Sequence, residues 1–393
     1  MIHNLHTFDL KDKRLLMRVD FNVPIDNGRV TDDFRLRAAL PTIQHCLQQG
    51  AAVVLMSHLG RPKGKVVDNL SLISVGETLA DLLEMPIKFS DDCISEDARD
   101  TSLGISPGEI HLLENLRFHD EETLNDHQFS MLLSKHGDVF INDAFGTAHR
   151  AHASNVGVVD QFRQKGIGFL MEKELKYLKE SFDHPLRPVT IILGGAKIDT
   201  KLSMIKRFLS KADTIIIGGG MAFTFLKAKG LEVGGSLIDD KMLSTATQIM
   251  NVVKNQKVQL VFPSDFVCAK DLESKPDGVY LRRDIPEDLM GLDIGPKSIE
   301  KFQKIISSSK TILWNGPLGV FEQEYYAQGT KAITEKLVEA TEAGQTTIVG
   351  GGDTVAAVRS IGFYRDVSHV STGGGAFLEL LSGETLPAFS ALR

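Results

Sequence analysis

The sequence has 393 residues, of which 42% are hydrophobic and 24% are charged, and its formal net charge is −7. A chain of this length can form two domains with sizeable cores, and its composition is that of a globular protein. The negative charge argues against a general nucleic-acid-binding protein, which would carry an excess of basic residues. A net negative charge is still compatible with local basic patches on the surface.

The cysteines and the apolar segments bear on the cellular setting. Cys46, Cys93 and Cys268 form no CxxC pair, so the sequence indicates neither a disulfide framework nor a zinc cluster. A reducing cytosol is the simplest setting for such a chain. The N-terminal segment lacks a signal-peptide core, and no apolar run reaches membrane-spanning length. We therefore expect a cytoplasmic protein with no membrane or nucleic-acid partner, and nothing demands more than a monomer.

Short apolar runs recur along the chain, separated by longer segments with helical periodicity. They lie at residues 15–19, 51–56, 110–113, 138–142, 189–193, 214–217, 259–262, 311–314, 346–349 and 368–371. Buried-type runs that alternate with helices are typical of parallel sheets with helices on both faces. The sequence thus predicts an α/β fold.

Residues 168–188 separate the two series of runs. Leu170, Leu175 and Leu178 lie at helical spacing, and two prolines close the segment. We predict a connecting helix here, between doubly wound, Rossmann-like parallel-sheet domains. The expected boundaries are 1–170 for the N-terminal domain, 171–188 for the hinge helix and 189–381 for the C-terminal domain.

Polar residues that follow the runs of the first half are the first candidates for a site, because ligands of open α/β sheets bind beyond the carboxyl ends of the strands. These residues are Asp20, Phe21 and Asn22, then 57–61, 114–117 and 143–150, with Arg35 shortly after the first group. Four arginines, one histidine and an Asp-Asn pair would gather at one end of the sheet. A single arginine there would be a surface residue, but the repeated placement predicts an anion site.

Two other features of the first half receive structural interpretations. His149 and His152 could belong to a metal site, but no carboxylate or cysteine completes it at this spacing, so we expect a structural role. The acidic run at 120–122 is expected to be a solvated helix face.

Strand ends of the second half are rich in glycine and lysine. They comprise 194–197 with Lys201, 218–220, 315–317 with Glu322, 350–354 and 373–375. Glycines at strand ends let a base and a polyphosphate approach the backbone, and Lys197 and Lys201 could share a helical face and reach phosphate oxygens. In residues 367–379 a strand-like run meets three glycines and a helix start, which would bind an anion or form a plain tight turn.

Some alternatives remain open on the residues alone. No GxxxxGK[ST] loop is present, so the site is not a P-loop, and the GxGxxG fingerprint is not convincingly matched at 218–220. A dehydrogenase is therefore the second candidate among enzymes, and a nucleotide-dependent interaction protein is a non-enzymatic one. Met221, Phe223 and Phe225 could floor an adenine pocket or pack against the sheet. Trp314 is expected in the core.

The motifs together resemble those of the phosphoglycerate kinase family over essentially the whole chain. They are RVDFNVP (18–24), TDDFRLRAALPTI (31–43), SHLGRPKG (57–64), LLENLRF (112–118), NDAFGTAHRAHAS (142–154), GFLMEKEL (168–175), LGGAK (193–197), GGGMAFTFLK (218–227), LDIGP (292–296), WNGPLGVFE (314–322), GGGDT (350–354) and STGGGAFLE (371–379). The resemblance implies an enzyme of glycolysis and gluconeogenesis. It would transfer the acyl phosphate of 1,3-bisphosphoglycerate reversibly to Mg-ADP, giving 3-phosphoglycerate and ATP.

The resemblance also implies the roles of individual residues. Phosphoglycerate would be bound by Asp20, Phe21, Asn22, Arg35, His58, Leu59, Gly60, Arg61, Arg117 and Arg150. The nucleotide would be bound by Gly195, Lys201, Gly219, Gly220, Asn315, Glu322, Gly351, Gly352, Asp353 and Thr354, with Asp353 as the contact to Mg²⁺. The transferring group would be served by Arg35, Lys197, Lys201, Gly373, Gly374 and Gly375. Residues 382–393 would return to the first domain, and the domains would close by hinge bending.

Two departures from the family pattern concern loop shape only. Residues 198–201 read Ile-Asp-Thr-Lys where Val-Ser-Asp-Lys is more usual, and 160–165 lacks a proline that we would expect before the connecting helix.

The residue inventory suits this reaction. The attacking oxygens of ADP and of the carboxylate are ionised at neutral pH, so the reaction needs alignment and charge dispersal rather than a general base.

Overall fold

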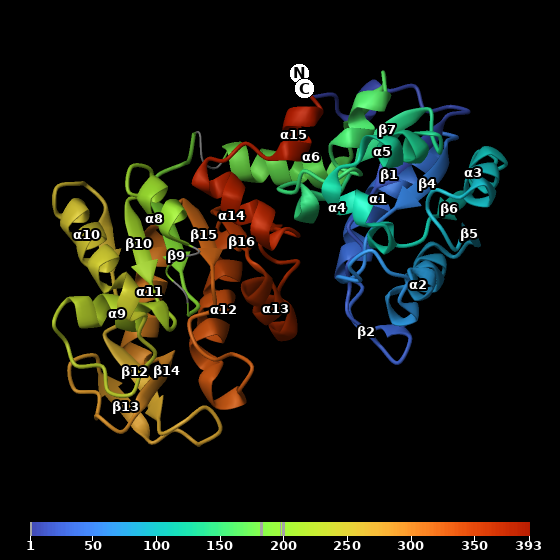
Figure 1. Ribbon diagram of the computed structural model, residues 1–393. Coiled ribbons are helices and arrows are strands. Elements are labelled where there is room, and N and C mark those ends of the chain that lie inside the picture. The colour runs from blue at the N-terminus through green and yellow to red at the C-terminus, as the bar shows by residue number, and fades with distance from the viewer. Residues whose placement is uncertain (1, 181–183, 197, 199–200) are drawn as a thin grey trace. The chain divides into compact units, whose positions relative to one another are not determined.

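The chain folds as two compact units in the computed structural model, which describes residues 2–180, 184–196, 198 and 201–393 (Figure 1). The first unit comprises Met1–Lys176 and Thr385–Arg393, and the second comprises Tyr177–Glu384. Each unit is built on a parallel sheet, so the α/β prediction is confirmed.

The sheet of the first unit has six strands in the order β5-β6-β4-β1-β7-β8, all paired in parallel. The strands are β1 (Arg14–Arg18), β4 (Ala52–Met56), β5 (Ile87–Phe89), β6 (Ile110–Leu112), β7 (Val139–Asn142) and β8 (Lys165–Ile167). All five residues of β4 are buried, as expected for a parallel strand whose two faces are both covered. The core of the unit lies against this sheet, with Leu15, Met17, Val53 and Leu55 at its centre.

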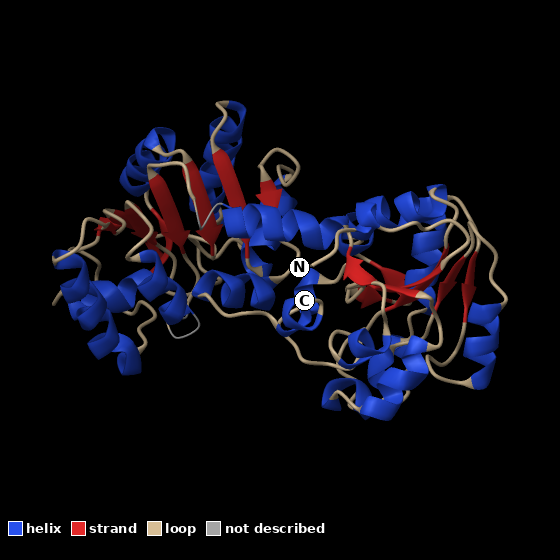
Figure 2. Cartoon of the chain, turned by 90° about the horizontal axis from the view of Figure 1, so that it is seen from above, coloured by secondary structure: helices blue, strands red, loops and turns tan. Residues whose placement is uncertain are grey.

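Helices cover both faces of this sheet (Figure 2). They are α1 (Phe34–Gln48), α2 (Ile73–Leu83), α3 (Glu96–Leu103), α4 (Asp120–Leu124), α5 (His127–Ser134), α6 (Phe169–Leu175) and α15 (Pro387–Ala391), and a small hairpin joins β2 (Ile25–Asp26) to β3 (Arg29–Val30). The C-terminal helix α15 is held by a hydrogen bond of 3.1 Å from the Ala388 amide to the Ala148 carbonyl. The Phe389 ring also packs on Phe145, with centroids 6.5 Å apart.

The second unit contains another six-stranded parallel sheet, in the order β11-β10-β9-β15-β16-β17. Its strands are β9 (Val189–Leu193), β10 (Thr214–Ile217), β11 (Gln259–Val261), β15 (Thr311–Asn315), β16 (Thr346–Gly350) and β17 (His369–Val370). Its helices are α8 (Leu202–Phe208), α9 (Met221–Ala228), α10 (Leu243–Lys254), α11 (Pro296–Ser308), α12 (Gln328–Glu342), α13 (Gly352–Ile361) and α14 (Gly374–Ser382).

An antiparallel sheet, β13-β12-β14, is a separate element of the second unit. It is formed by β12 (Asp265–Ala269), β13 (Gly278–Leu281) and β14 (Met290–Ile294). Every predicted apolar run forms a strand, but this sheet and the three-residue strands β5 and β8 were not predicted. β5 and β8 each include a lysine, and β12 and β14 each include an aspartate, so none of these four strands is a continuous apolar run.

The segment between the two sheets is helical over Phe169–Glu180, and the domain boundaries expected around it stay predictions. Helix α6 continues directly into a π-helical stretch at Lys176–Glu180. Leu178 on this stretch is buried. The predicted hinge role of the segment stays a prediction.

The strand order places a topological switch point in each sheet. On one side of β1 lie β4, β6 and β5, and on the other lie β7 and β8; β9 is likewise flanked by β10 and β11 on one side and by β15, β16 and β17 on the other. Because chain connections diverge at such a point, they leave a crevice outside the carboxyl ends of the strands. The residues after β1, β4, β9 and β15 therefore occupy the positions where ligands of this fold class bind.

Candidate functional site

Asp20 and Arg35 form an ion pair at the end of β1. The Asp20 carboxylate lies 2.7 Å from Nη1 of Arg35, which also donates to the Asn22 carbonyl at 3.3 Å. Asp20 follows β1 by two residues, and Arg35 lies in the first turn of α1. The chain passes through the β2–β3 hairpin after β1, and the start of α1 then lies close to the end of β1.

The neighbouring strand ends are linked by side-chain hydrogen bonds to backbone. Asn22 Oδ1 accepts from the Gly60 amide at 2.9 Å, and Arg117 Nη1 donates to the Gly60 carbonyl at 2.7 Å. Asn115 Oδ1 accepts from the Leu59 amide at 3.1 Å. The segments that follow β1, β4 and β6 are therefore held together. Phe21 and Leu59 are buried in the core, and their backbone amides donate to Ser57 Oγ and Asn115 Oδ1.

His58 lies beneath this cluster with a fixed tautomer. Its Nδ1 is 3.1 Å from Nη2 of Arg18 and 3.9 Å from the Asp20 carboxylate. Since arginine can only donate, Nδ1 accepts and the ring proton is on Nε2. Burial, together with the positive charge of Arg18 and of further arginines nearby, holds the pKa of His58 well below its ordinary value. A neutral histidine therefore offers one N–H donor.

Arg18 and Glu122 are two charged residues of this region that the sequence reasoning missed. Arg18 is fully buried, and its Nε donates to Ser154 Oγ at 2.8 Å, which in turn donates to Glu122 Oε1 at 2.7 Å. The expectation of a solvated face at 120–122 was wrong for Glu122, which is completely buried. Burial opposes its ionisation, but His152, Arg18 and Ser154 together hold its pKa below the ordinary value. The only sequence signal was a charged residue within the apolar run that forms β1.

A cavity of about 530 Å³ lies beside this cluster, within the first unit. Its cationic lining consists of Arg61, Lys63, Arg117 and Arg150, and Asp120 is its one carboxylate. Burial and then the charges of Arg150 and Arg18 lower the pKa of Arg117 to about 10. Its buried Nε has no hydrogen-bond partner in the described part of the chain. The structure thus brings three of the four predicted arginines to one cavity with an excess of positive charge, which suits a small anion, while Arg35 is not among the lining residues.

The second unit contains a larger cavity, of about 760 Å³. Five predicted nucleotide-binding residues line it: Gly195, Gly219, Gly220, Glu322 and Asp353. Apolar side chains form much of the remaining wall, namely Phe223, Phe266, Leu237, Met290, Leu292, Leu318 and Val320. A cavity lined by apolar side chains, glycine turns and a few polar groups suits a base joined to phosphates.

The three candidate pocket residues at the start of α9 separate into two groups. Phe223 lines the cavity, and its ring lies 4.5 Å from that of Phe266. Met221 and Phe225 are fully buried, and Phe225 packs on Phe262 with ring centroids 5.7 Å apart. Trp314 is likewise fully buried, as expected, and its Nε1 donates to the Gly316 carbonyl at 2.8 Å.

Glycine is required at the turn after β10. Gly219 has φ of +58°, and a Cβ built there would lie 2.4 Å from the amide nitrogen of Gly195. Both the backbone conformation and the close approach exclude a larger residue. The backbone of the turns after β9 and β10 can therefore line the cavity directly.

Lys201 lies at the N-cap of α8, immediately before the helix begins. It is only 8% exposed, and its Nζ donates to the Gly194 carbonyl at the end of β9. Burial lowers the pKa of Lys201 to about 8, although the charge of Asp353 opposes the shift. Lys197 lies outside the described residues, so the helical face that it would share with Lys201 stays a prediction.

Asn315 and Thr354 are buried residues that bind neighbouring backbone. Asn315 Nδ2 donates to the Gly350 carbonyl at 2.9 Å, and Thr354 Oγ1 accepts from the Gly316 amide at 2.6 Å. These two hydrogen bonds join the segments at the ends of β15 and β16.

Two helix N-termini lie together at this edge. A Cβ built on Gly374, the first residue of α14, would be 3.4 Å from the amide nitrogen of Gly352, the first residue of α13. The strand, glycines and helix expected over 367–379 are confirmed as β17 and α14. The positive ends of two helix dipoles would attract a phosphoryl group here.

Comparison with known proteins identifies the family. A family model described as phosphoglycerate kinase matches residues 5–384. The chain belongs to the phosphoglycerate kinase family. The curated phosphoglycerate kinases of Synechococcus elongatus and Chlorobium phaeobacteroides are both 47% identical to it, over 391 and 392 residues. These alignments cover 99% of this chain in both cases, and 97% and 99% of the relatives.

Solved phosphoglycerate kinase structures agree over the full chain. That from Coxiella burnetii has a TM-score of 0.89 and 36% identity, and covers 100% of this chain and 99% of that one. That from Pyrococcus horikoshii OT3 has a TM-score of 0.88 and 31% identity, and covers 100% and 98%. The resemblance, the two-sheet fold and the assignment as a glycolytic phosphotransferase are confirmed, and the dehydrogenase alternative is set aside. None of the helices in the described ranges has the length and apolar character needed to cross a bilayer.

Proposed function

We propose that this phosphoglycerate kinase binds the phosphoglycerate at the arginine-lined cavity of the first unit and the nucleotide at the apolar cavity of the second. The reaction would be reversible transfer of the acyl phosphate of 1,3-bisphosphoglycerate to Mg-ADP, giving 3-phosphoglycerate and ATP. The observation that carries the proposal is the contrast between these cavities. One is lined by four cations, and the other by glycine turns, apolar side chains and five carboxylates.

Phosphoglycerate carries a phosphate and a carboxylate, and the first unit has donors for both. Arg61, Arg117 and Arg150 would hold the phosphate end within the cavity, with Lys63 as an additional cation. Asp20, Asn22, Arg35 and His58 would hold the carboxylate and hydroxyl end, where Asp20 accepts and the others donate, and Gly60 would support them through its hydrogen bond to Asn22. Their mutual hydrogen bonds fix the donors before the substrate arrives.

The nucleotide would lie with its base against Phe223 and Leu237 and its ribose near Glu322. Lys201, Asn315, Gly351, Gly352 and Thr354 would lie along the path of its phosphates. Asp353 fits a role in binding Mg²⁺, because it is an exposed carboxylate in the first turn of α13 that lines the same cavity. Mg²⁺ in such sites takes one or two carboxylates plus phosphate and water oxygens, and when bound it neutralises phosphate charge.

The residues of this chain would stabilise the transfer by electrostatics and alignment. Neither attacking oxygen needs a base, since both are ionised at neutral pH. Arg35, Lys201 and the amides of Gly373, Gly374 and Gly375 would disperse charge on the transferring phosphoryl group. Lys197, which the structure does not describe, keeps the same proposed role.

Closure of the two units about the connecting segment would complete the site. The phosphoryl group must move between ligands held by different units, and water must be excluded to avoid hydrolysis of ATP. Small-angle scattering of the free and doubly liganded protein tests this step; identical profiles would contradict it. We also propose that the enzyme acts in the cytoplasm and as a monomer.

The decisive experiment is a coupled assay on the purified protein with 3-phosphoglycerate and Mg-ATP, following reduction of the product by an added NADH-dependent dehydrogenase. We expect turnover that requires both substrates and the metal and that falls sharply in Lys201→Ala. Lys206→Ala is the matched control, because Lys206 is an exposed lysine on the adjoining helix α8. Binding of both ligands without turnover would instead support a nucleotide-dependent interaction protein.

A further inference from the structure

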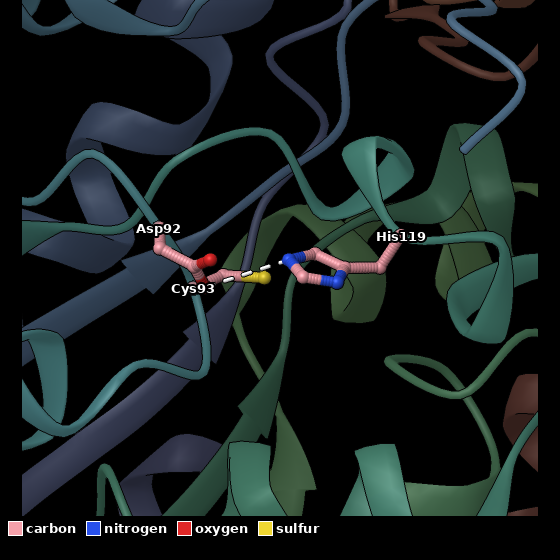
Figure 3. Close-up of side chains that lie close together, drawn as sticks. All are labelled: Asp92, Cys93 and His119. Carbon is pink, nitrogen blue, oxygen red and sulfur yellow. Dashed lines mark ion pairs between the residues drawn. The ribbon is translucent and has the colours of Figure 1, made fainter. Parts of the chain in front are cut away.

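Asp92, Cys93 and His119 meet in the first unit, outside the residues used in the proposed mechanism. Asp92 and Cys93 lie in the loop between β5 and α3, and His119 lies between the 3₁₀ turn η3 (Leu116–Phe118) and α4. One ligand atom from each residue, a carboxylate oxygen, a sulfur and a ring nitrogen, lies within 4.8 Å of the other two. Figure 3 shows the Cys93 sulfur and the Asp92 carboxylate beside the same nitrogen of the His119 ring.

Contacts with the surrounding fold hold each of the three residues. Asp92 Oδ1 accepts from the Ile94 amide at 2.6 Å and lies 3.4 Å from His119 Nε2. The Cys93 carbonyl lies 3.1 Å from Nε2 of His136, and the His119 ring packs on Phe129 with centroids 5.4 Å apart. The Cys93 side chain is only 1% exposed. The arrangement is therefore built into the fold rather than formed by mobile surface side chains.

We propose that Asp92, Cys93 and His119 form a binding site for a divalent transition-metal ion of the zinc type, with water as a further ligand. Thiolate, imidazole and carboxylate together are the donor set of zinc, whereas Mg²⁺ takes oxygen ligands alone. Zinc ligands lie about 2.0–2.3 Å from the metal, so their atoms are roughly 3.5 Å apart. The three ligand atoms, which lie within 4.8 Å of one another, would move inward to bind the ion. On binding, the sulfur–metal bond forms and the thiol proton passes to solvent.

The site could not be found from cysteine spacing. The absence of a CxxC pair indicated no zinc cluster, but that criterion detects only ligands close together in sequence. Here β5 pairs with β6, so the loop after β5, which carries Asp92 and Cys93, lies beside the segment after β6, which carries His119. His119 is two residues beyond Arg117, so an ion at this site restrains the segment that carries a residue of the basic cavity.

The test is titration of the untagged, full-length, metal-free protein with Co²⁺, a spectroscopic substitute for Zn²⁺, without nucleotide. We expect one ion per chain, a thiolate-to-cobalt charge-transfer band, displacement by Zn²⁺, and a higher thermal unfolding temperature with the metal, because binding to the native state stabilises it. No charge-transfer band with a folded protein would overturn the proposal. Binding that leaves the unfolding temperature unchanged would also count against it.

Variants with matched controls locate the site. Cys93→Ser should abolish the band, and both Cys93→Ser and His119→Gln should weaken Zn²⁺ binding by about 100-fold or more, since loss of a supporting residue alone costs roughly 10- to 100-fold. Cys46→Ser, at another buried cysteine of the same unit, should keep both. If Cys93→Ser fails to fold, Asp92→Asn at a half-buried position gives the same test, with exposed Asp91→Asn as its control. Unchanged binding in His119→Gln and Asp92→Asn would contradict the assignment.

Discussion

The Asp20 carboxylate lies 2.7 Å from Nη1 of Arg35, and this pair sets the direction of the arginine at the carboxyl end of β1. The Asp20 side chain is 8% exposed, whereas that of Arg35 is 29% exposed. The aspartate is therefore the more buried partner, and part of the Arg35 side chain stays accessible to a ligand. An arginine fixed in this way loses less conformational entropy when it binds a second anion. The pair therefore prepares Arg35 for a role in the reaction.

Replacing Arg35 should slow the reaction itself. We expect Arg35→Ala to lower kcat by on the order of 100- to 1,000-fold, as found when a donor to a developing charge is removed. Steady-state kinetics with both substrates varied would measure the effect. Arg37→Ala, which removes the neighbouring and more exposed arginine paired with Asp33, should change kcat little. A change in KM alone for Arg35→Ala would show that Arg35 binds substrate without stabilising the transition state.

The lowered pKa of Lys201 predicts a pH dependence. Because burial brings this pKa down to about 8, the lysine of the free enzyme loses its charge as pH rises through about 8. A neutral amine cannot neutralise phosphate, so kcat/KM for Mg-ATP should fall above that pH. Lys201→Arg should keep measurable activity and lose this alkaline decline, since arginine stays charged. An identical pH profile in Lys201→Arg would assign the decline to another group.

The positions of the strands and of many candidate site residues could be predicted, and the reason is physical. Central strands of a parallel sheet are buried on both faces and appear as apolar runs, and ligands bind at their carboxyl ends. Asp20, His58 and Arg117 were found by this reasoning, while the role assigned to each came from family resemblance. The same reasoning predicted the glycine turns that line the second cavity.

Side chains that act through tertiary contacts could not be predicted in this way. Arg18 lies within a strand and Glu122 within an acidic helix, and only the fold shows that Ser154 joins them. The cluster of Asp92, Cys93 and His119 likewise depends on which strands are neighbours. Such contacts leave no periodic pattern in the sequence.

The close approach of α13 and α14 predicts a substitution that fits sterically but harms turnover. In Gly374→Ala the new methyl group would lie 3.4 Å from the Gly352 amide nitrogen, an ordinary contact, in the space between the two helix N-termini. We expect the unfolding temperature to stay within a few degrees of the parent, and kcat to fall at least about 10-fold because one phosphate-facing helix start is obstructed. Gly104→Ala, whose methyl group would also lie 3.4 Å from its nearest neighbour at the end of α3, is a control of equal size. Full activity in Gly374→Ala would exclude this space from the path of the phosphoryl group.

His111 predicts how the first unit responds to acid. Its ring is fully buried, and its nitrogens lie 2.8 Å from the hydroxyls of Ser90 and Ser102. Burial, followed by the neighbouring His136, lowers the pKa of His111 from 6.5 to about 4. Between these two pH values the unfolded chain binds the proton more readily than the folded one, so the free energy of unfolding should fall as pH falls from 6.5 towards 4.

The loss from this one group should amount to roughly 3.5 kcal/mol at most, at about 1.4 kcal/mol per pKa unit. Hydrogen exchange of the amides of β6 across that pH window would measure it within the first unit. His111→Gln should unfold more easily at neutral pH, because it loses a fitted buried ring, but should show a flatter decline in acid. The exposed His127→Gln should leave the decline unchanged. If His111→Gln declined as steeply as the parent, the acid sensitivity would have to arise from other groups.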